Sequence, residues 1–124
     1  MSKIVSAAVI CLSFCVTAPA VADISLQTES AVRTSWYGPG LQGNSMANGN
    51  RFDMNDHTVV AHKSLPFGTK IRLENPENGR VLVVTVQDRG PYVKGRELDV
   101  SKAAAERLGF KAQGVATLKA RVIN

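Results

Sequence analysis

The sequence predicts a mainly β domain, folded as a closed barrel or a sandwich, with one short helix. Short runs of β-branched and aromatic residues recur along the chain, and the gaps between them carry glycine, proline or asparagine in turn patterns. One segment instead has an unbroken set of helix-forming residues. Many short strands at this spacing are typical of barrels and sandwiches, which leave few strand edges exposed.

The first 22 residues predict a secretory signal peptide. Lys3 supplies a positive end, residues 4–16 form an apolar run, and residues 20–22 form a small-residue cleavage site. The apolar run is shorter than the roughly 20 residues that a membrane-spanning helix needs. We therefore expect export through a cleaved signal peptide to the periplasm or cell envelope, with no stable membrane span.

Both cysteines of the chain, Cys11 and Cys15, lie in that leader, so the exported part is expected to fold without disulfides. Lipidation of Cys15 is disfavoured because the bulky Phe14 precedes it, but the sequence leaves an anchor open. Removing 22 of the 124 residues leaves 102, enough for one domain with its own core, expected as a monomer. The formal net charge of +5 is compatible with anionic envelope polymers, lipid head groups or no partner, while export argues against nucleic acid.

Local sequence patterns predict the bounds of each element of the domain. Residues 23–31 are polar and without a period, so we expect a flexible N-terminal segment before a domain that spans residues 32–124. Ser101 can cap a helix over residues 102–108 that Gly109 ends. A connection rich in Pro, Asn and Gly joins the third and fourth of the expected strands in a hairpin. The expected strands are 32–37, 58–61, 69–74, 81–87, 97–100 and 115–123.

Asp88 is the first candidate for chemistry. It follows an apolar strand and precedes the turn Gly90-Pro91, where a carboxyl group is half desolvated yet within reach of a substrate. Burial raises the pKa of a carboxyl group toward the operating pH, which is the condition for an Asp to donate a proton. In the structural alternative, Asp88 only accepts backbone hydrogen bonds from the turn.

Four motifs follow one another along the chain: Ser-Trp-Tyr-Gly at 35–38, Met-Ala-Asn-Gly-Asn at 46–50, Ala-His-Lys-Ser-Leu-Pro-Phe-Gly-Thr at 61–69, and Asp-Arg-Gly-Pro at 88–91 with Asp-Val-Ser-Lys-Ala-Ala-Ala at 99–105. Over roughly residues 34–123 the chain resembles the rare lipoprotein A (RlpA)-like lytic transglycosylases. The resemblance implies a six-stranded double-psi β-barrel with one or two short helices. It also implies cleavage of peptidoglycan glycan strands to leave 1,6-anhydro-muramyl ends during cell wall remodelling, without a cofactor.

The resemblance also implies site residues. Asp88 matches the family's acidic catalytic residue and His62 its histidine, while Asn50 stands where the family has a Glu. A lytic transglycosylase uses the substrate's own C6 hydroxyl in place of water, so one carboxyl group can suffice and Asn50 can orient a sugar group. The rival interpretation is an expansin-like module that binds glycan without cutting it, which the loss of the Glu favours.

The remaining candidates carry structural alternatives. His62 can be a structural histidine. Asp99 can accept hydrogen bonds from backbone amides at the start of the helix, whereas in expansins and family 45 glycoside hydrolases a matching Asp lines the active groove. Trp36 and Tyr37 alternate across a strand, so one is expected to contact sugar and the other to lie in the core. With one favoured histidine and no exported cysteine, a metal site is not expected. A third interpretation is a secreted effector or inhibitor in the manner of barwin-like proteins.

Overall fold

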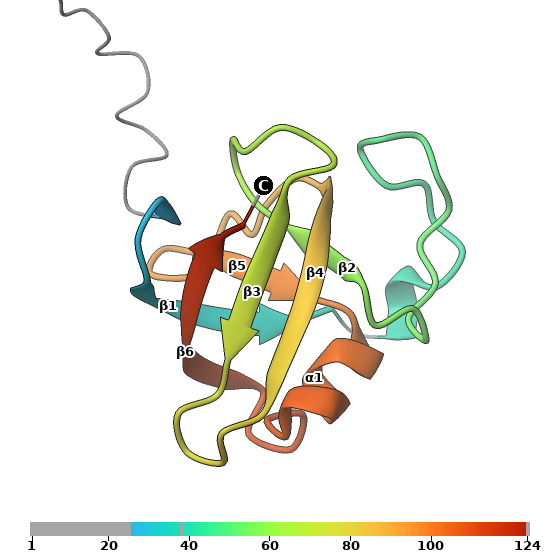
Figure 1. Cartoon of the computed structure of the whole chain (residues 1–124). Helices are drawn as coiled ribbons and strands as arrows, with labels where there is room; N and C mark the ends of the chain where they lie inside the picture. Colours follow the sequence, from blue (N-terminus) through green and yellow to red (C-terminus); the bar gives the residue numbers. More distant parts are fainter. Residues whose placement is uncertain (1–25, 38, 124) are drawn as a thin grey trace, which may run out of the picture.

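The computed structural model describes residues 26–37 and 39–123 (Figure 1), and the expected signal peptide lies outside them. Each expected strand is present, with ends that differ from the prediction by no more than two residues. Within the described residues, no helix is long and apolar enough to cross a membrane. The elements are β1 (Ser30–Trp36), the 3-10 turn η3 (Pro39–Leu41), β2 (Val59–Ala61), β3 (Lys70–Glu74), β4 (Val81–Asp88), β5 (Leu98–Val100), α1 (Lys102–Leu108) and β6 (Val115–Val122).

The described strands close into one six-stranded barrel in the order β1, β5, β2, β4, β3, β6. The pairs β1–β5 and β2–β4 are parallel, and the other pairs are antiparallel. The predicted hairpin is β3 with β4, paired from Lys70 opposite Thr85 to Glu74 opposite Val81. A closed barrel, rather than a sandwich, is therefore the correct choice between the two predicted architectures.

The main core fills the barrel and the space under α1. The inward positions of the strands are fully buried, and α1 adds its apolar face. Each such Val, Leu or Phe contributes roughly 1.5–3 kcal/mol by its burial. The largest fully buried side chains of the protein's described residues include Phe110, Ile71, Leu73, Leu98, Leu108 and Leu118.

The boundary of the domain differs from the prediction. Leu26 is only 4% exposed and belongs to the main core, and β1 begins at Ser30, opposite Ala120 of β6. The expectation of a flexible segment up to residue 31 is therefore wrong from Leu26 onward. The cause is the side chain of Leu26, which belongs to no periodic pattern in the sequence yet packs in the main core.

Helix α1 begins and ends as predicted. The Ser101 hydroxyl oxygen accepts a hydrogen bond from the Ala104 amide at 3.1 Å, and Gly109 has a left-handed φ of 78°. The side-chain amides of Asn75 and Asn78, from the hairpin loop, donate to the Leu108 carbonyl oxygen at 2.8 and 3.0 Å. The end of the helix is thereby fixed to the β3–β4 loop.

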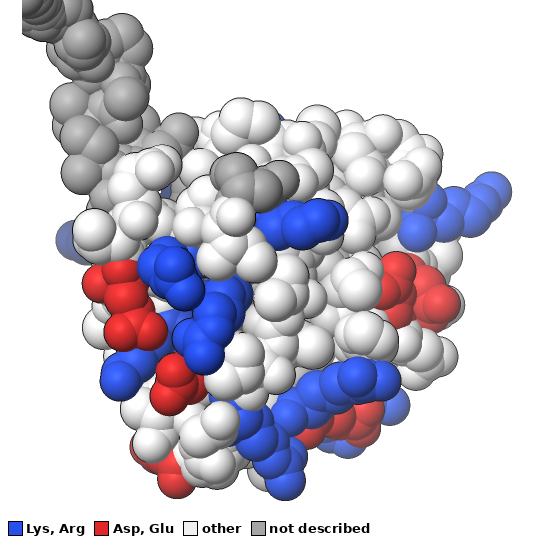
Figure 2. Space-filling model, in the orientation of Figure 1, with Lys and Arg blue, Asp and Glu red and all other residues white. Residues whose placement is uncertain are grey.

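Charged side chains of both signs share the face of β3, β4 and β6 that Figure 2 presents. Arg72 lies opposite Arg121 in the β3–β6 register, a like-charge pair that is unfavourable by itself. Arg72 also forms an ion pair with Glu74 at 3.3 Å, which offsets part of that repulsion.

Candidate functional site

Two carboxyl groups flank the short strand β2. Ala61 is the register partner of Asp88 on β4 and of Asp99 on β5, with a bulge between Val60 and Ala61 on the β4 side. Register partners on neighbouring strands point to the same face of a sheet. Since Val60 points into the barrel core, Asp88 and Asp99 lie together on the outer face.

A long loop between η3 and β2 covers part of that outer face. It places Met46 and Phe52 against Val59 and Ala61 in a second, smaller core cluster, which also includes Tyr37. The rings of Tyr37 and Phe52 stack with their centroids 4.5 Å apart. The loop therefore removes water from one side of the aspartates while it leaves both of them partly accessible.

Asp88 accepts three hydrogen bonds from the described residues. Its Oδ1 accepts from the backbone amides of Ala47 at 2.8 Å and Arg89 at 2.9 Å, and its Oδ2 accepts from the Tyr37 hydroxyl at 3.2 Å. A carboxylate oxygen has two lone pairs, so among the described residues Oδ1 is fully used while Oδ2 keeps one lone pair open. A proton or a substrate hydroxyl group therefore meets Asp88 at Oδ2.

Asp99 is the carboxyl group with an altered affinity for protons. Burial raises its pKa from 3.8 to about 6, against the lowering effects of a hydrogen bond from Ser35 and of the nearby Arg96, and the charge of Asp88 raises it further. The Ser35 hydroxyl donates to Oδ1 of Asp99 at 2.9 Å. Asp99 is thus able to hold a proton in mildly acidic to neutral solution.

Tyr37 connects the two aspartates. Burial, followed by the charges of Asp88 and Asp99, raises the pKa of its phenol far above the usual range. The hydroxyl group therefore stays protonated and remains a hydrogen-bond donor to Asp88. The sequence predicted that one of Trp36 and Tyr37 contacts sugar and the other lies in the core; Tyr37 is buried and donates to the carboxylate.

The backbone of His62 is hydrogen-bonded to the backbone of Asp88. Its amide donates to the Asp88 carbonyl oxygen at 3.2 Å, while its ring Nδ1 accepts from the amides of Ser64 and Leu65, both at 3.0 Å. Because Nδ1 accepts two N–H groups, the proton of the neutral ring belongs on Nε2. The ring therefore stabilises the loop after β2.

Asn50 lies on the turn that touches Asp88. Its carbonyl oxygen accepts from the Met46 amide at 2.7 Å and its amide donates to Oδ1 of Asn48 at 3.0 Å. Ala47, which donates to Asp88, belongs to the same turn. The exposed side chain of Asn50 is thus carried at the rim of the site.

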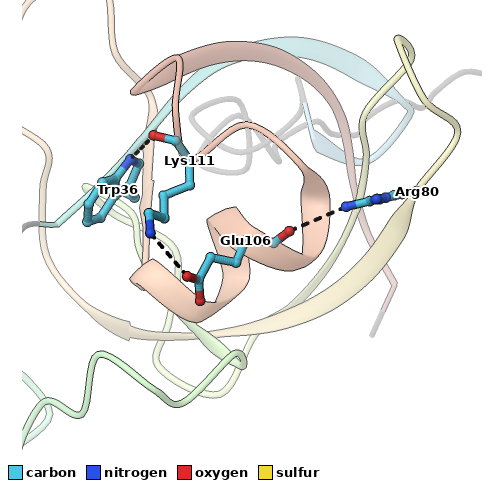
Figure 3. Close-up of polar contacts among 4 residues, drawn as sticks. All are labelled: Trp36, Arg80, Glu106 and Lys111. Atoms are coloured by element: carbon cyan, nitrogen blue, oxygen red, sulfur yellow. Dashed lines mark hydrogen bonds and ion pairs between the residues drawn. The ribbon is translucent and has the colours of Figure 1, made fainter.

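Trp36 is not brought to the aspartates. It packs against the main core, and its indole N–H donates to the Lys111 carbonyl oxygen at 3.1 Å, beside the Lys111–Glu106 ion pair (Figure 3). In the same view, Arg80 donates to the Glu106 carbonyl oxygen. The predicted alternation of Trp36 and Tyr37 is present, and it turns Trp36 away from the site.

Arg89 follows Asp88 and anchors the neighbouring loop. Its guanidinium group donates to the carbonyl oxygens of His62 at 3.3 Å and Leu65 at 2.8 Å, and its Cζ lies 4.1 Å from the centroid of the Phe67 ring. Local sequence patterns did not predict these carbonyl partners, nor the Ala47 amide and Ser35 hydroxyl that donate to the aspartates. Within the described residues, no group of His, Cys, Asp and Glu is arranged to hold a metal ion.

The barrel and its site define a class of proteins. A family model described as "Lytic transglycolase", a double-psi β-barrel family, matches residues 29–120. The chain therefore belongs to this family, as its resemblance to RlpA-like proteins implied.

Among the curated relatives is the "Probable endolytic peptidoglycan transglycosylase RlpA" of Aquifex aeolicus, 47% identical over 89 residues, which are 72% of this chain and 39% of the relative. The "Endolytic peptidoglycan transglycosylase RlpA" of Neisseria meningitidis serogroup A is 48% identical over 85 residues, or 68% of this chain and 35% of the relative. The RlpA of Pseudomonas aeruginosa is 41% identical over 90 residues, or 73% of this chain and 26% of the relative. The chain thus spans well under half the length of these relatives.

Solved structures confirm the fold. The Streptomyces papain inhibitor superposes with a TM-score of 0.64 at 20% identity and covers 80% of this chain and 97% of its own. The expansin of Clavibacter michiganensis superposes with a TM-score of 0.60 at 22% identity and covers 78% of this chain and 51% of its own. At these identities the likeness concerns the fold and not the activity.

Proposed function

We propose that the chain is a lytic transglycosylase that cleaves peptidoglycan glycan strands and leaves 1,6-anhydro-muramyl ends. The observation that carries this proposal is the setting of Asp88, which keeps one lone pair of Oδ2 open among the described residues and has a second carboxyl group, Asp99, across the short strand β2. Curated relatives at 39–49% identity bear the name endolytic peptidoglycan transglycosylase, which supports the same reaction.

Asp88 acts as both acid and base in this proposal. A proton on Oδ2 passes to the glycosidic oxygen as the bond from C1 to that oxygen breaks, which releases the leaving sugar as an alcohol. The C6 hydroxyl oxygen of the same muramyl residue then bonds to C1, and its proton returns to Oδ2. The products are a 1,6-anhydro ring and a free hydroxyl group, and no water is consumed.

Asp99 and Tyr37 set the proton content of the site. Burial raises the pKa of Asp99 to about 6, so this carboxyl group can hold a proton near Asp88 in mildly acidic solution. The Tyr37 hydroxyl, always a donor, holds Oδ2 in place. His62 assists through Nε2 or through the loop that it stabilises.

Asn50 is proposed as a substrate contact at the rim. Its amide can bond to a sugar hydroxyl group or an acetamide, but it cannot take up or release a proton. We further propose that the chain acts as a monomer in the periplasm or cell envelope, after export through a cleaved signal peptide. Cell wall remodelling is the process that this location and reaction would serve.

The test is to incubate the purified exported chain with peptidoglycan and with stripped glycan strands, and to identify the products by mass spectrometry. Asp88→Asn keeps the oxygen that accepts from Ala47 and Arg89 but has no proton to deliver, so we expect anhydro-ended fragments to disappear. Glu77→Gln, in an exposed loop, is the matched control and should leave the products unchanged. Equal anhydro product from wild type and Asp88→Asn would refute the role of Asp88.

A glycan-binding module of the expansin kind is the second candidate, and Asn50 is the observation that favours it. In that case the wild type co-sediments with peptidoglycan and leaves the strands intact. Asn50→Glu in an inactive parent would then introduce cleavage. Anhydro-ended fragments from the wild type would dismiss this candidate.

A further inference from the structure

Tyr92 is the most exposed large apolar side chain among the described residues. It is 77% exposed, and its neighbour Val93 is 51% exposed. A single exposed apolar residue is common and has no meaning alone. The exposure of Tyr92 has a meaning because of its position: Tyr92 lies in the loop of residues 89–97, which joins Asp88 to the strand that carries Asp99.

The base of this loop is fixed although the Tyr92 ring is open to solvent. Gly90 and Pro91 are buried, and Arg89 is held by two carbonyl oxygens and by the Phe67 ring. A β-carbon placed on Gly90 would lie 3.7 Å from Cδ2 and Cε2 of Tyr92, so the ring lies against the glycine. Part of the ring thus rests on fixed backbone, and most of it faces water.

The ring lies near Asp88 along the chain. Two residues of chain span at most about 7 Å, and Gly90, on which the ring lies, is two residues from Asp88. Successive sugar rings of a glycan strand are separated by a similar distance. A strand with one glycosidic bond at Oδ2 of Asp88 can therefore extend a neighbouring sugar as far as Tyr92.

We propose that Tyr92 is the stacking platform for an N-acetylated pyranose ring one sugar away from the bond at Asp88. This assignment rests on the proposed function and adds a residue that determines how the strand is seated. The hydrogen-bearing face of a pyranose is apolar and slightly positive, and it fits the negative face of an aromatic ring. A tyrosine loses little conformational entropy on binding, which suits a surface that must hold an extended polymer.

The experiment compares three variants of the exported chain. Tyr92→Ala removes the ring, Tyr92→Phe keeps it without the hydroxyl group, and Val81→Ala removes an exposed apolar side chain, 46% exposed, at the opposite end of β4. Binding of stripped glycan strands is measured by titration calorimetry, and the product ends by mass spectrometry. NMR spectra follow the Tyr92 ring protons as the strands are added.

We expect Tyr92→Ala to raise the dissociation constant about tenfold, while Tyr92→Phe and Val81→Ala stay near wild type and the ring protons shift on binding. Unchanged binding by Tyr92→Ala overturns the platform, since so exposed a residue is not needed for folding. If the wild type binds glycan but forms no anhydro ends, the proposed cleavage is refuted. The binding affinity of Tyr92→Ala then still tests whether Tyr92 is a stacking platform. Wild type that binds no glycan overturns both proposals.

Discussion

Asp99→Asn is predicted to make the protein more stable at neutral pH while it impairs the site. Asp99 is mostly removed from water, and its ionised form is therefore disfavoured in the folded protein. Asn has nearly the same shape and can still accept the hydrogen bond from Ser35 through its oxygen. The substitution thus removes a charge from an unfavourable place without removing the packing.

The pKa values fix the size and the pH window of this effect. A rise from 3.8 to about 6 corresponds to about 3 kcal/mol, and solvent around the partly exposed carboxyl group reduces this to about 1–2 kcal/mol. The folded state binds the proton more tightly than the unfolded state. Stability from this group is therefore fully present below pH 3.8 and is lost as the pH rises through about 6.

The measurement is urea unfolding of wild type and Asp99→Asn between pH 4 and pH 8, with Glu77→Gln as the control for the loss of an exposed carboxylate. We expect the two proteins to be equally stable near pH 4, and Asp99→Asn to be more stable by about 1–2 kcal/mol at pH 7. A difference that does not change with pH would refute the reasoning. So would an Asp99→Asn protein that is less stable at pH 7.

Three further predictions concern the surroundings of the aspartates and the helix end. Tyr37→Phe removes the donor to Oδ2 of Asp88 and leaves the stacking on Phe52, so we expect the free energy of unfolding to fall by about 1 kcal/mol. The rate of anhydro-product formation should fall more than substrate binding, as separate kcat and KM values will show. Gly109→Ala places a β-carbon 2.5 Å from the Asn78 amide nitrogen at a φ of +78°; unfolding experiments should show a loss of more than about 1 kcal/mol, whereas Gly95→Ala, with open space around it, should lose less. Asp88→Asn should leave binding of stripped strands within about threefold of wild type while product formation stops, and a loss of binding as large as the loss of product would contradict its role as acid and base.

Local chemistry made most of the fold predictable. The helix from Lys102 to Leu108 begins and ends at the capping residues that the sequence shows, because capping depends only on neighbouring residues. The strand ends follow the glycine and proline turns for the same reason. The choice of a closed barrel came from the resemblance, since the order of strands depends on contacts between residues far apart in the chain.

The contacts of the site were not predictable from local patterns. Asp88 is held by Ala47 and Tyr37, which are 41 and 51 residues away. The register shift that brings Asp88 opposite the same alanine as Asp99 leaves Gln87 of β4 without a partner on β2, and no local sequence pattern marks it. Trp36 and Tyr37 were correctly expected to face opposite ways, but only the packed structure shows which of them reaches the carboxylates.

The carboxyl groups that remain determine which reaction the site can perform without a Glu at position 50. A hydrolase of the usual kind needs one carboxyl group to protonate the leaving oxygen and another, on the far side of the sugar, to activate water or attack C1. Asp88 and Asp99 instead lie on the same outer face, on either side of β2, and Asn50 cannot act as a base. Such a site can deliver and recover one proton on one side of the sugar, which is what attack by the sugar's own C6 hydroxyl group requires. The substitution at position 50 therefore weakens the case for hydrolysis more than the case for transglycosylation.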